Sequence, residues 1–168
     1  MSLSMYQASV PVFIRMLINL STILDKTAAH AEAKKIDPGA FINARLAPDM
    51  FALNRQIQIA TDSAKGCAAR LANIEIPSYA DTETTFAELK ARIAKTIAFL
   101  ESVNATQIDG SEDRKITLKI GGKEMNFQGQ QYLLNFVLPN FYFHVVTAYA
   151  ILRHNGLECG KKDYLGSV

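Results

Sequence analysis

Hydrophobic residues recur every three or four positions in four stretches of the chain. The first stretch has apolar positions at Tyr6, Val10, Phe13, Leu17, Leu20 and Leu24, and the second at Met50, Leu53, Ile57, Ala60, Ala64, Cys67 and Leu71. The third has Phe86, Leu89, Ile93, Ile97 and Leu100, and the fourth Leu133, Val137, Phe141, Val145, Ala148 and Leu152. This spacing places apolar side chains on one stripe of a helix. Four such stripes predict four helices packed around one core.

Proline and capping residues indicate where the predicted helices begin. Pro11 is tolerated in a first helical turn, so Ser9 is the expected N-cap of the first helix; a start nearer Ser4 would make Pro11 bend it. Pro48 suits an early position of the second helix. In the third, Asp81-Thr82 offers a capping site, and Thr85 with Glu88 fits a capping box.

The last third of the chain contains the one β pattern. Ile116, Leu118 and Ile120 alternate with polar residues before Gly121-Gly122, and Met125 and Phe127 alternate after it. Two alternating runs around Gly-Gly predict a hairpin with a two-residue turn. Because an isolated hairpin is marginally stable, it should lie against the helices or on a partner subunit.

Two features near the end of the chain leave alternatives open. Pro139 lies inside the fourth helical stretch, residues 130–153, and should kink or break that helix. The tail after Gly156 contains Gly160, Gly166 and Lys161-Lys162, and is either a surface strap or a mobile end.

Composition indicates one domain, residues 1–168, of an ordinary soluble protein. Hydrophobic residues make up 49% and charged residues 20% of the chain. The net charge is only +2, with Lys and Arg scattered among Asp and Glu, which argues against a nucleic-acid partner. The start lacks a signal-peptide pattern and no apolar run reaches roughly 20 residues, so we expect a cytoplasmic protein without a membrane span. Two cysteines, Cys67 and Cys159, make no disulfide framework, and Cys67 is a poor nucleophile in an apolar repeat.

His144 is the residue with the clearest chemical potential. Of the three histidines, it alone falls on the inner side of a predicted helix, and Asn140 lies four residues earlier on the same face. The ring could serve as a metal ligand, a general base or a group that orients a substrate. The alternative is a histidine at the edge of the core that is satisfied by hydrogen bonds to its neighbours.

A metal site needs more ligands than the sequence supplies near His144. A catalytic zinc normally has three protein ligands, and the chain has neither an HExxH nor an HxxxH pattern. Asp49 and Asp62 are candidate carboxylates, but their spacing does not link them to His144. Gln56 follows Leu53 by three residues and can point inward, either toward a pocket or as a helix-flanking contact. The predicted ligand pocket therefore comprises Gln56, Asp49, Asn140 and His144.

Consecutive aromatic residues suggest a further contact. Phe141, Tyr142 and Phe143 cannot all face one way, so at least one must touch another element, a ligand or a second subunit. An exposed ring on a broad apolar patch would indicate a homodimer.

Two sequence motifs resemble an uncharacterised bacterial family within the DinB-like superfamily. They are the run Leu-Ala-Pro-Asp-Met-Phe at 46–51 and the run Leu-Pro-Asn-Phe-Tyr-Phe-His at 138–144, continued by residues 148–156. The resemblance covers nearly the whole chain and implies an all-α, up-down-down-up four-helix bundle, often dimeric. Many superfamily members hold a divalent metal, such as nickel or zinc, with one histidine from the second helix and two from an HxxxH pattern in the last. Some are thiol-dependent transferases or isomerases, such as mycothiol-dependent maleylpyruvate isomerase.

The same resemblance places the family's ligand positions on this chain. His144 corresponds to the second histidine of the HxxxH pattern, Asn140 to the first, and Gln56 or Gln58 to the position on the second helix. Amide oxygens bind nickel or zinc poorly. We therefore expect a small-molecule-binding or structural homodimeric module that lacks the histidine triad and holds no metal except through His144. The alternative is a metal- or thiol-dependent transferase or isomerase with His144 as its catalytic residue.

Overall fold

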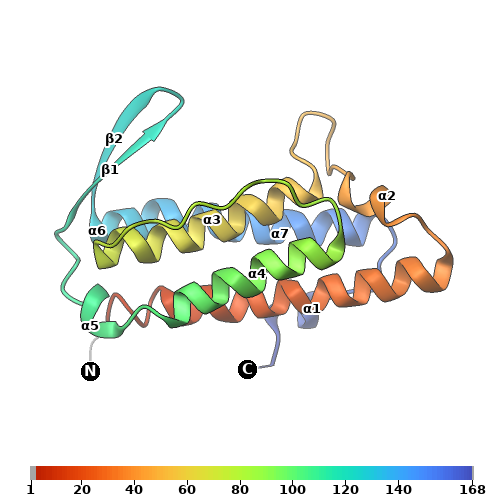
Figure 1. Cartoon of the computed structure of the whole chain (residues 1–168), viewed down its shortest axis with the longest axis horizontal. Helices are drawn as coiled ribbons and strands as arrows, with labels where there is room; N and C mark the ends of the chain where they lie inside the picture. Colours follow the sequence, from red (N-terminus) through yellow and green to blue (C-terminus); the bar gives the residue numbers. More distant parts are fainter. Residues whose placement is uncertain (1–2, 168) are drawn as a thin grey trace.

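Four long helices lie side by side in the computed structural model, which describes residues 3–167 (Figure 1). They are α1 (Val10–Lys34), α3 (Leu53–Ala72), α4 (Phe86–Glu101) and α7 (Leu138–His154). Shorter helices join or extend them: α2 (Pro38–Ile42), α5 (Ala105–Ile108), α6 (Gly129–Gln131) and α8 (Lys161–Leu165). A π-helix, η1 (Tyr132–Val137), connects α6 to α7. The fold is therefore mostly helical, as the apolar spacing predicted.

The predicted helix starts are confirmed in part. Thr85 caps α4 as expected, since its hydroxyl accepts from the Glu88 N–H at 3.2 Å and the Glu88 carboxylate accepts from the Thr85 N–H at 3.0 Å. Helix α1 begins at Val10 with Pro11 in its first turn. Ser9 does not cap it, because its hydroxyl donates instead to the Met5 carbonyl at 2.6 Å.

The prediction for Pro48 was wrong, and of the two alternatives for Pro139 the break was wrong. Pro48 lies in the loop before α3, whose first residue is Leu53, so Pro48 and Met50 are outside the helix. Pro139 does not break the last helix, which stays helical from Gly129 to His154. Instead the wider turns of η1 come directly before it. Since Pro139 has no N–H to complete the α-helical ladder, the disturbance takes the form of π-helical turns.

The core lies between the long helices and contains most of the predicted apolar positions. Phe13 on α1 and Phe141 on α7 are fully buried, and their rings meet edge to face with centres 4.9 Å apart. Leu17, Leu20 and Ile57 are likewise shielded from solvent. The four predicted stripes thus face one another.

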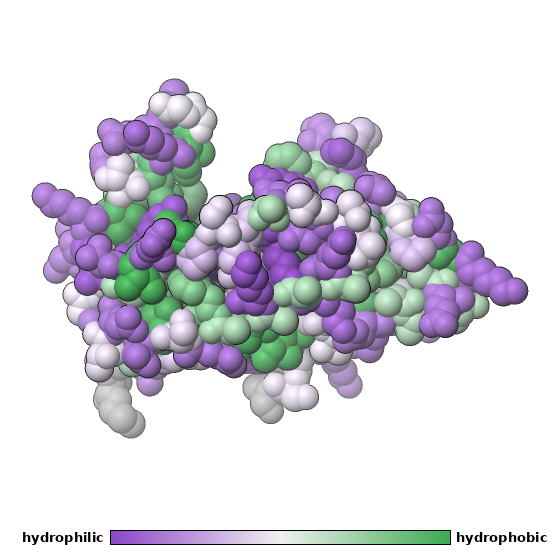
Figure 2. Space-filling model, viewed as in Figure 1, coloured by the Kyte–Doolittle hydropathy of each residue, from purple (hydrophilic) through white to green (hydrophobic). Residues whose placement is uncertain are grey.

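The predicted hairpin is present and lies against the start of the last helix. Strands β1 (Lys115–Ile120) and β2 (Lys123–Gln128) pair antiparallel with Ile120 opposite Lys123. Gly121 and Gly122, at φ 57° and 79°, form the turn in the left-handed region that glycine adopts without strain. The Phe127 ring packs against Tyr132 and Phe136 of η1, with centres 5.9 and 5.4 Å apart. In Figure 2 the hairpin projects from the body of the molecule.

The tail forms a strap rather than a loose end. Arg15 and Asn19 of α1 donate to the carbonyls of Leu165 and Tyr164, at 2.8 and 3.0 Å. Lys26 of α1 forms an ion pair with Asp163. Helix α8 is therefore bound along α1.

One stretch, Gly129–His154, is long and apolar enough to cross a membrane by length and composition alone. The core helix of a soluble protein meets the same criterion, and this stretch packs along α3 and buries Phe141, Val145 and Ile151 in the core. The match is weak evidence for a membrane span.

Candidate functional site

Gln56 of α3 and His144 of α7 meet in the buried contact between the two helices. The His144 Nδ1 lies 2.7 Å from the Gln56 Oε1, and the Gln56 amide nitrogen donates to the Phe51 carbonyl at 3.0 Å. A carbonyl can only accept, so this second bond fixes which way the amide points. The Gln56 oxygen therefore faces the ring, and Nδ1 of His144 carries the proton.

The buried position keeps the His144 ring neutral. Desolvation, with the Arg55 charge adding to it, lowers the pKa of His144 from 6.5 to about 4. With the proton on Nδ1, the Nε2 atom has a free lone pair at neutral pH. No residue among 3–167 forms a hydrogen bond with that atom. The ring can accept a hydrogen bond there, although its low pKa makes it a weak base.

The other two predicted pocket residues do not contact this pair. Asn140 is half-buried on α7, and its amide donates to the Ser63 hydroxyl of α3 at 2.8 Å. Asp49 is exposed in the loop before α3. The structure thus brings Gln56 and His144 together, places Asn140 along the same helix contact, and leaves Asp49 outside it.

The side chains along the α3–α7 contact do not fit a divalent metal. The Gln56 oxygen already accepts a hydrogen bond from His144, and the Asn140 amide is committed to Ser63. Within the described part of the chain, no three His, Cys, Asp or Glu side chains converge in a way that could hold an ion. Amide oxygens with one imidazole are poor donors for nickel or zinc. Cys67 offers no thiolate either, since burial raises its pKa.

A cavity of about 500 Å³ lies beside this contact, between α3, the hairpin and the start of the last helix. We call it the α3–η1 cavity. The α3 residues that line it are Arg55, Ile59, Asp62, Ser63 and Arg70; the hairpin adds Leu118, Lys119 and Ile120; and the last helix adds Tyr132, Phe136, Val137 and Asn140. Two of these residues connect the cavity to the Gln56–His144 pair. Arg55 directly precedes Gln56 in the sequence, and Asn140 lies one helical turn before His144.

The π-helix supplies the aromatic wall of this cavity. Tyr132, Phe136 and Val137 all belong to η1, and the rings of Tyr132 and Phe136 stack with centres 6.2 Å apart. π-Helical turns are rare and are found frequently at functional sites, because the extra residue re-aims neighbouring side chains. The one irregular segment of the last helix therefore faces the cavity.

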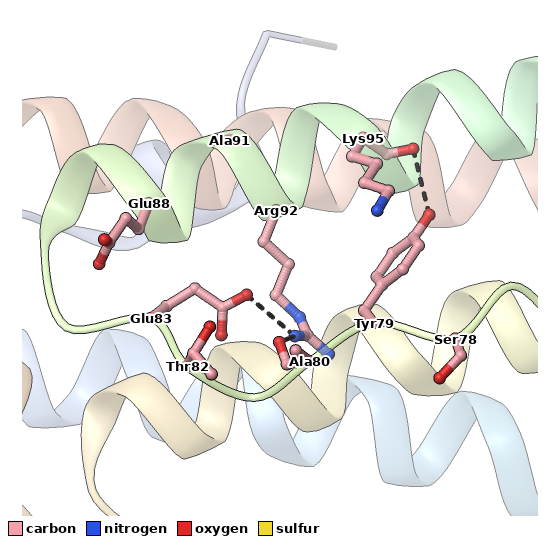
Figure 3. A pocket seen from close by; sticks show the side chains of 9 residues that line it. All are labelled: Ser78, Tyr79, Ala80, Thr82, Glu83, Glu88, Ala91, Arg92 and Lys95. Atoms are coloured by element: carbon pink, nitrogen blue, oxygen red, sulfur yellow. Dashed lines mark hydrogen bonds and ion pairs between the residues drawn. The ribbon is translucent and has the colours of Figure 1, made fainter.

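A second cavity, of about 360 Å³, lies between α4 and residues 73–85, which run back along the helices (Figures 1 and 3). We call this segment the crossover and the hollow the crossover cavity. Arg92 points from α4 toward the crossover, where it donates to the Ala80 carbonyl and the Glu83 carboxylate, each at 3.0 Å (Figure 3). Its Nε donates to the Thr61 hydroxyl at 2.8 Å. These bonds fasten the crossover to the helices.

Sequence reasoning missed the charged residues of the α3–η1 cavity. Arg55 and Arg70 lie on α3 but outside its apolar stripe, from which the sequence prediction for that helix started. One signal was available: Gly66 interrupts a predicted helix four residues before Arg70. A glycine inside a helix costs stability and usually has a packing reason.

Comparison with known proteins shows the fold class of the chain and the family to which it belongs. A crystal structure described as a DinB family member protein from Shewanella denitrificans is 43% identical, with a TM-score of 0.88, over 97% of this chain and 92% of that one. The fold is thus that of a DinB family protein. Residues 5–165 match the family described as a domain of unknown function (DUF1993), and the chain belongs to that family. No curated protein matches the chain. The predicted resemblance is confirmed.

Proposed function

We propose that this protein is a small-molecule-binding module whose ligand occupies the α3–η1 cavity. The observation that carries the proposal is the π-helix η1, which turns Tyr132, Phe136 and Val137 into a cavity of about 500 Å³. That volume lies in the range of small-molecule sites, roughly 300–1,000 Å³. Apolar and polar groups contribute about equally to its wall, so the cavity can hold a ligand that has both.

The order of the long helices is part of this proposal. We infer that α1, α3, α4 and α7 run up, down, down and up, as in the superfamily that the sequence resembles. The crossover supports this order, because it carries the chain back along α3 before α4 begins (Figure 1). In that arrangement α3 and α7 correspond to the helices that supply the family's site. A cytoplasmic location remains a prediction from the sequence.

Filling the cavity tests the proposal. The probe is 1-anilinonaphthalene-8-sulfonate, whose fluorescence rises in apolar sites. We expect saturable binding to the native protein and at least a roughly tenfold weaker affinity in Ile59→Trp, because the larger side chain occupies the cavity. Ile97→Trp is the matched control, since Ile97 is also half-buried but lies on α4 away from this cavity. Equal binding by both variants, or no saturable binding at all, would refute the proposal.

A homodimer is the second part of the proposal. Phe143 and Val146 lie three residues apart on the outer face of α7 and are 55% and 44% exposed. Phe51, also 55% exposed, sits beside the same place, since its carbonyl binds Gln56. An exposed apolar patch of this kind is typical of an interaction surface. A second copy would cover it and seal the Gln56–His144 pair from water.

Sedimentation analysis tests the dimer. The native protein should sediment as a dimer at micromolar concentration, and Phe143→Asp should make it a monomer by placing a charge in the interface. Ile74→Asp, at an exposed position near the far end of α3, should leave the dimer intact. A monomeric native protein at about 100 μM would contradict this part of the proposal.

The alternative function is a metal- or thiol-dependent transferase or isomerase that uses His144. The free lone pair on Nε2 favours it, whereas the amide partners around the ring do not. Elemental analysis of protein purified without chelating resin separates the two. Stoichiometric nickel or zinc that disappears in His144→Ala would establish the enzyme and displace the binding module.

A further inference from the structure

We propose that the ligand of the α3–η1 cavity is an amphipathic organic anion whose charged group is bound by Arg70. This inference rests on the proposed function, and it names the class of ligand. It follows from three features of Arg70: its missing counter-ion, the way its guanidinium is held, and the charge of the surrounding wall.

Among the residues that the structure describes, Arg70 has no acidic partner. Among residues 3–167, the acidic side chains that form ion pairs do so with other cations. The single hydrogen bond of the Arg70 guanidinium goes from Nη1 to the Tyr132 hydroxyl, at 3.1 Å. A guanidinium has five N–H donors in a planar fork that matches a carboxylate or phosphate. A half-buried arginine with most of these donors free, on a cavity wall, suits an anion.

One nitrogen of the Arg70 guanidinium, Nη1, has a defined place beside Gly66. A Cβ added at Gly66 would come within 2.5 Å of Nη1. The same nitrogen donates to the Tyr132 hydroxyl of η1 at 3.1 Å. Glycine inside a helix costs about 1 kcal/mol relative to alanine. The absence of a side chain at this position therefore leaves room for the guanidinium next to Tyr132.

The cavity wall is positive around this group. Lys119 lines it together with Arg70. Arg55 also lines it but is paired with Asp81, and Asp62 is the one acidic residue among the lining residues. The Asp62 carboxylate is already paired with Lys65 at 3.0 Å and with Arg92 at 2.9 Å. The carboxylate is therefore neutralised from outside the cavity, and an anion inside it meets an excess of positive charge.

Tyr132 adds a second polar contact for the same group. Its hydroxyl accepts from Arg70 and keeps its own proton, since desolvation raises the pKa of Tyr132 to about 12. That proton can be donated to an anionic oxygen next to the guanidinium. The apolar side chains of Ile59, Leu118 and Phe136 are left to contact the body of the ligand. The site thus selects a molecule with one charged end and an apolar remainder.

Calorimetric titration with a matched pair of probes tests the inference. The probes are 2-naphthoate, which carries a carboxylate, and 2-naphthamide, which has the same ring system without the charge. We expect the native protein to bind 2-naphthoate at least roughly tenfold more tightly, since charge-assisted hydrogen bonds to a guanidinium are strong. Arg70→Met should abolish the preference. Arg45→Met is the control, because Arg45 is exposed in the loop before α3 and its loss changes the net charge equally.

The outcomes separate this inference from the proposed function. Equal affinity of the native protein for the two probes, or an undiminished preference in Arg70→Met, would overturn the anion inference and leave the binding module standing. Failure of both probes to bind would overturn both. The comparison of probes on the native protein does not depend on any variant, so it decides the question even if Arg70→Met does not fold.

Discussion

Two arginines, Arg92 at the crossover cavity and Arg70 at the α3–η1 cavity, differ in how far they are buried and in how many partners they have. On the crossover side, the Arg92 guanidinium is bound by Thr61, Ala80 and Glu83 and also pairs with Asp62 at 2.9 Å and Asp81 at 3.1 Å. On the other side, Arg70 has the Tyr132 hydroxyl alone. A buried charge must be paired, and Arg92, whose side chain is 2% exposed, has all its partners within the protein, so it holds the fold together. Arg70 is half-buried, so its remaining donors are open to water or to the anion that we propose.

Tyr79 shows how thoroughly the crossover side is satisfied. Its ring lies between two ammonium groups, with the Lys65 Nζ 3.8 Å and the Lys95 Nζ 4.1 Å from the ring centre. Its hydroxyl donates to the Lys95 carbonyl at 3.4 Å (Figure 3). These cation–π contacts and the Arg92 bonds hold the crossover over the middle of α3 and α4. The hollow among them is a consequence of this packing, and we assign no ligand to it.

The largest effect is expected on the paired side. Arg92→Leu leaves the mostly buried Glu83 carboxylate without its cation, and breaking a buried ion pair in this way costs about 3–5 kcal/mol. Urea unfolding should show that loss in the free energy of unfolding. Lys90→Leu on the same helix removes an exposed pair with Asp25 and should cost less than about 1 kcal/mol. Similar losses in the free energy of unfolding for the two variants would contradict the structural role that we give to Arg92.

An intermediate effect is expected from His144, which is satisfied on one nitrogen only. Its pKa is about 4 in the folded protein and 6.5 as a free side chain, so the unfolded chain binds more protons between these values. Stability is therefore complete above about pH 6.5 and falls as the pH drops toward 4, by about 2–3 kcal/mol. His144→Gln should lose this part of the pH dependence in urea unfolding at about pH 7 and pH 4.5.

The exposed His154 provides the control for that measurement. His154→Gln should keep the pH dependence of the native protein. If His144→Gln and the native protein lose stability in parallel as the pH falls, the ring is not held neutral by burial, and its place beside the cavity has to be revised.

The smallest effect should come from Gly66→Ala. Its thermal stability should hold or rise, whereas its affinity for the ligand should fall. Alanine favours the helix by up to about 1 kcal/mol, and the atom that its Cβ meets is the end of a flexible side chain. The thermal midpoint should therefore hold or rise slightly. Affinity for 2-naphthoate should fall about tenfold, because the Arg70 guanidinium is displaced. Unchanged affinity with raised stability would show that Gly66 has no part in positioning Arg70.

The sequence predicted the regular parts of this molecule well, because each carries a local signal. Apolar spacing gave the four long helices, the Thr85–Glu88 pair gave one helix start, and Gly121-Gly122 gave the hairpin turn. Pro48 misled because proline suits loops as readily as first helical turns. At Pro139 the sequence indicates a disturbed helix, but whether that means a break or π-helical turns depends on packing against the hairpin.

The candidate site was predicted only where helix periodicity alone decides the contact. Gln56 and His144 each sit next to buried positions of a stripe, so their meeting followed from two helices facing one another. Asp49 lies in a loop, whose path no periodicity fixes. For Arg70 the sequence offered only the helical Gly66 as a signal, because the absence of an acidic partner becomes visible only when every neighbour has been placed.

The packing of the C-terminal strap along α1 also affects how the chain folds during synthesis. Helix α1 packs against α4, α7 and α8, all of which follow it, and α8 comes last. About a hundred residues separate the end of α1 from the start of α7, which a ribosome adds in roughly 5–20 s. During synthesis Phe13 therefore leaves the exit tunnel long before Phe141 exists to cover it. The newborn helix can pack on α3 and α4 first, and the surface that α7 and α8 cover stays within reach of chaperones until those helices arrive.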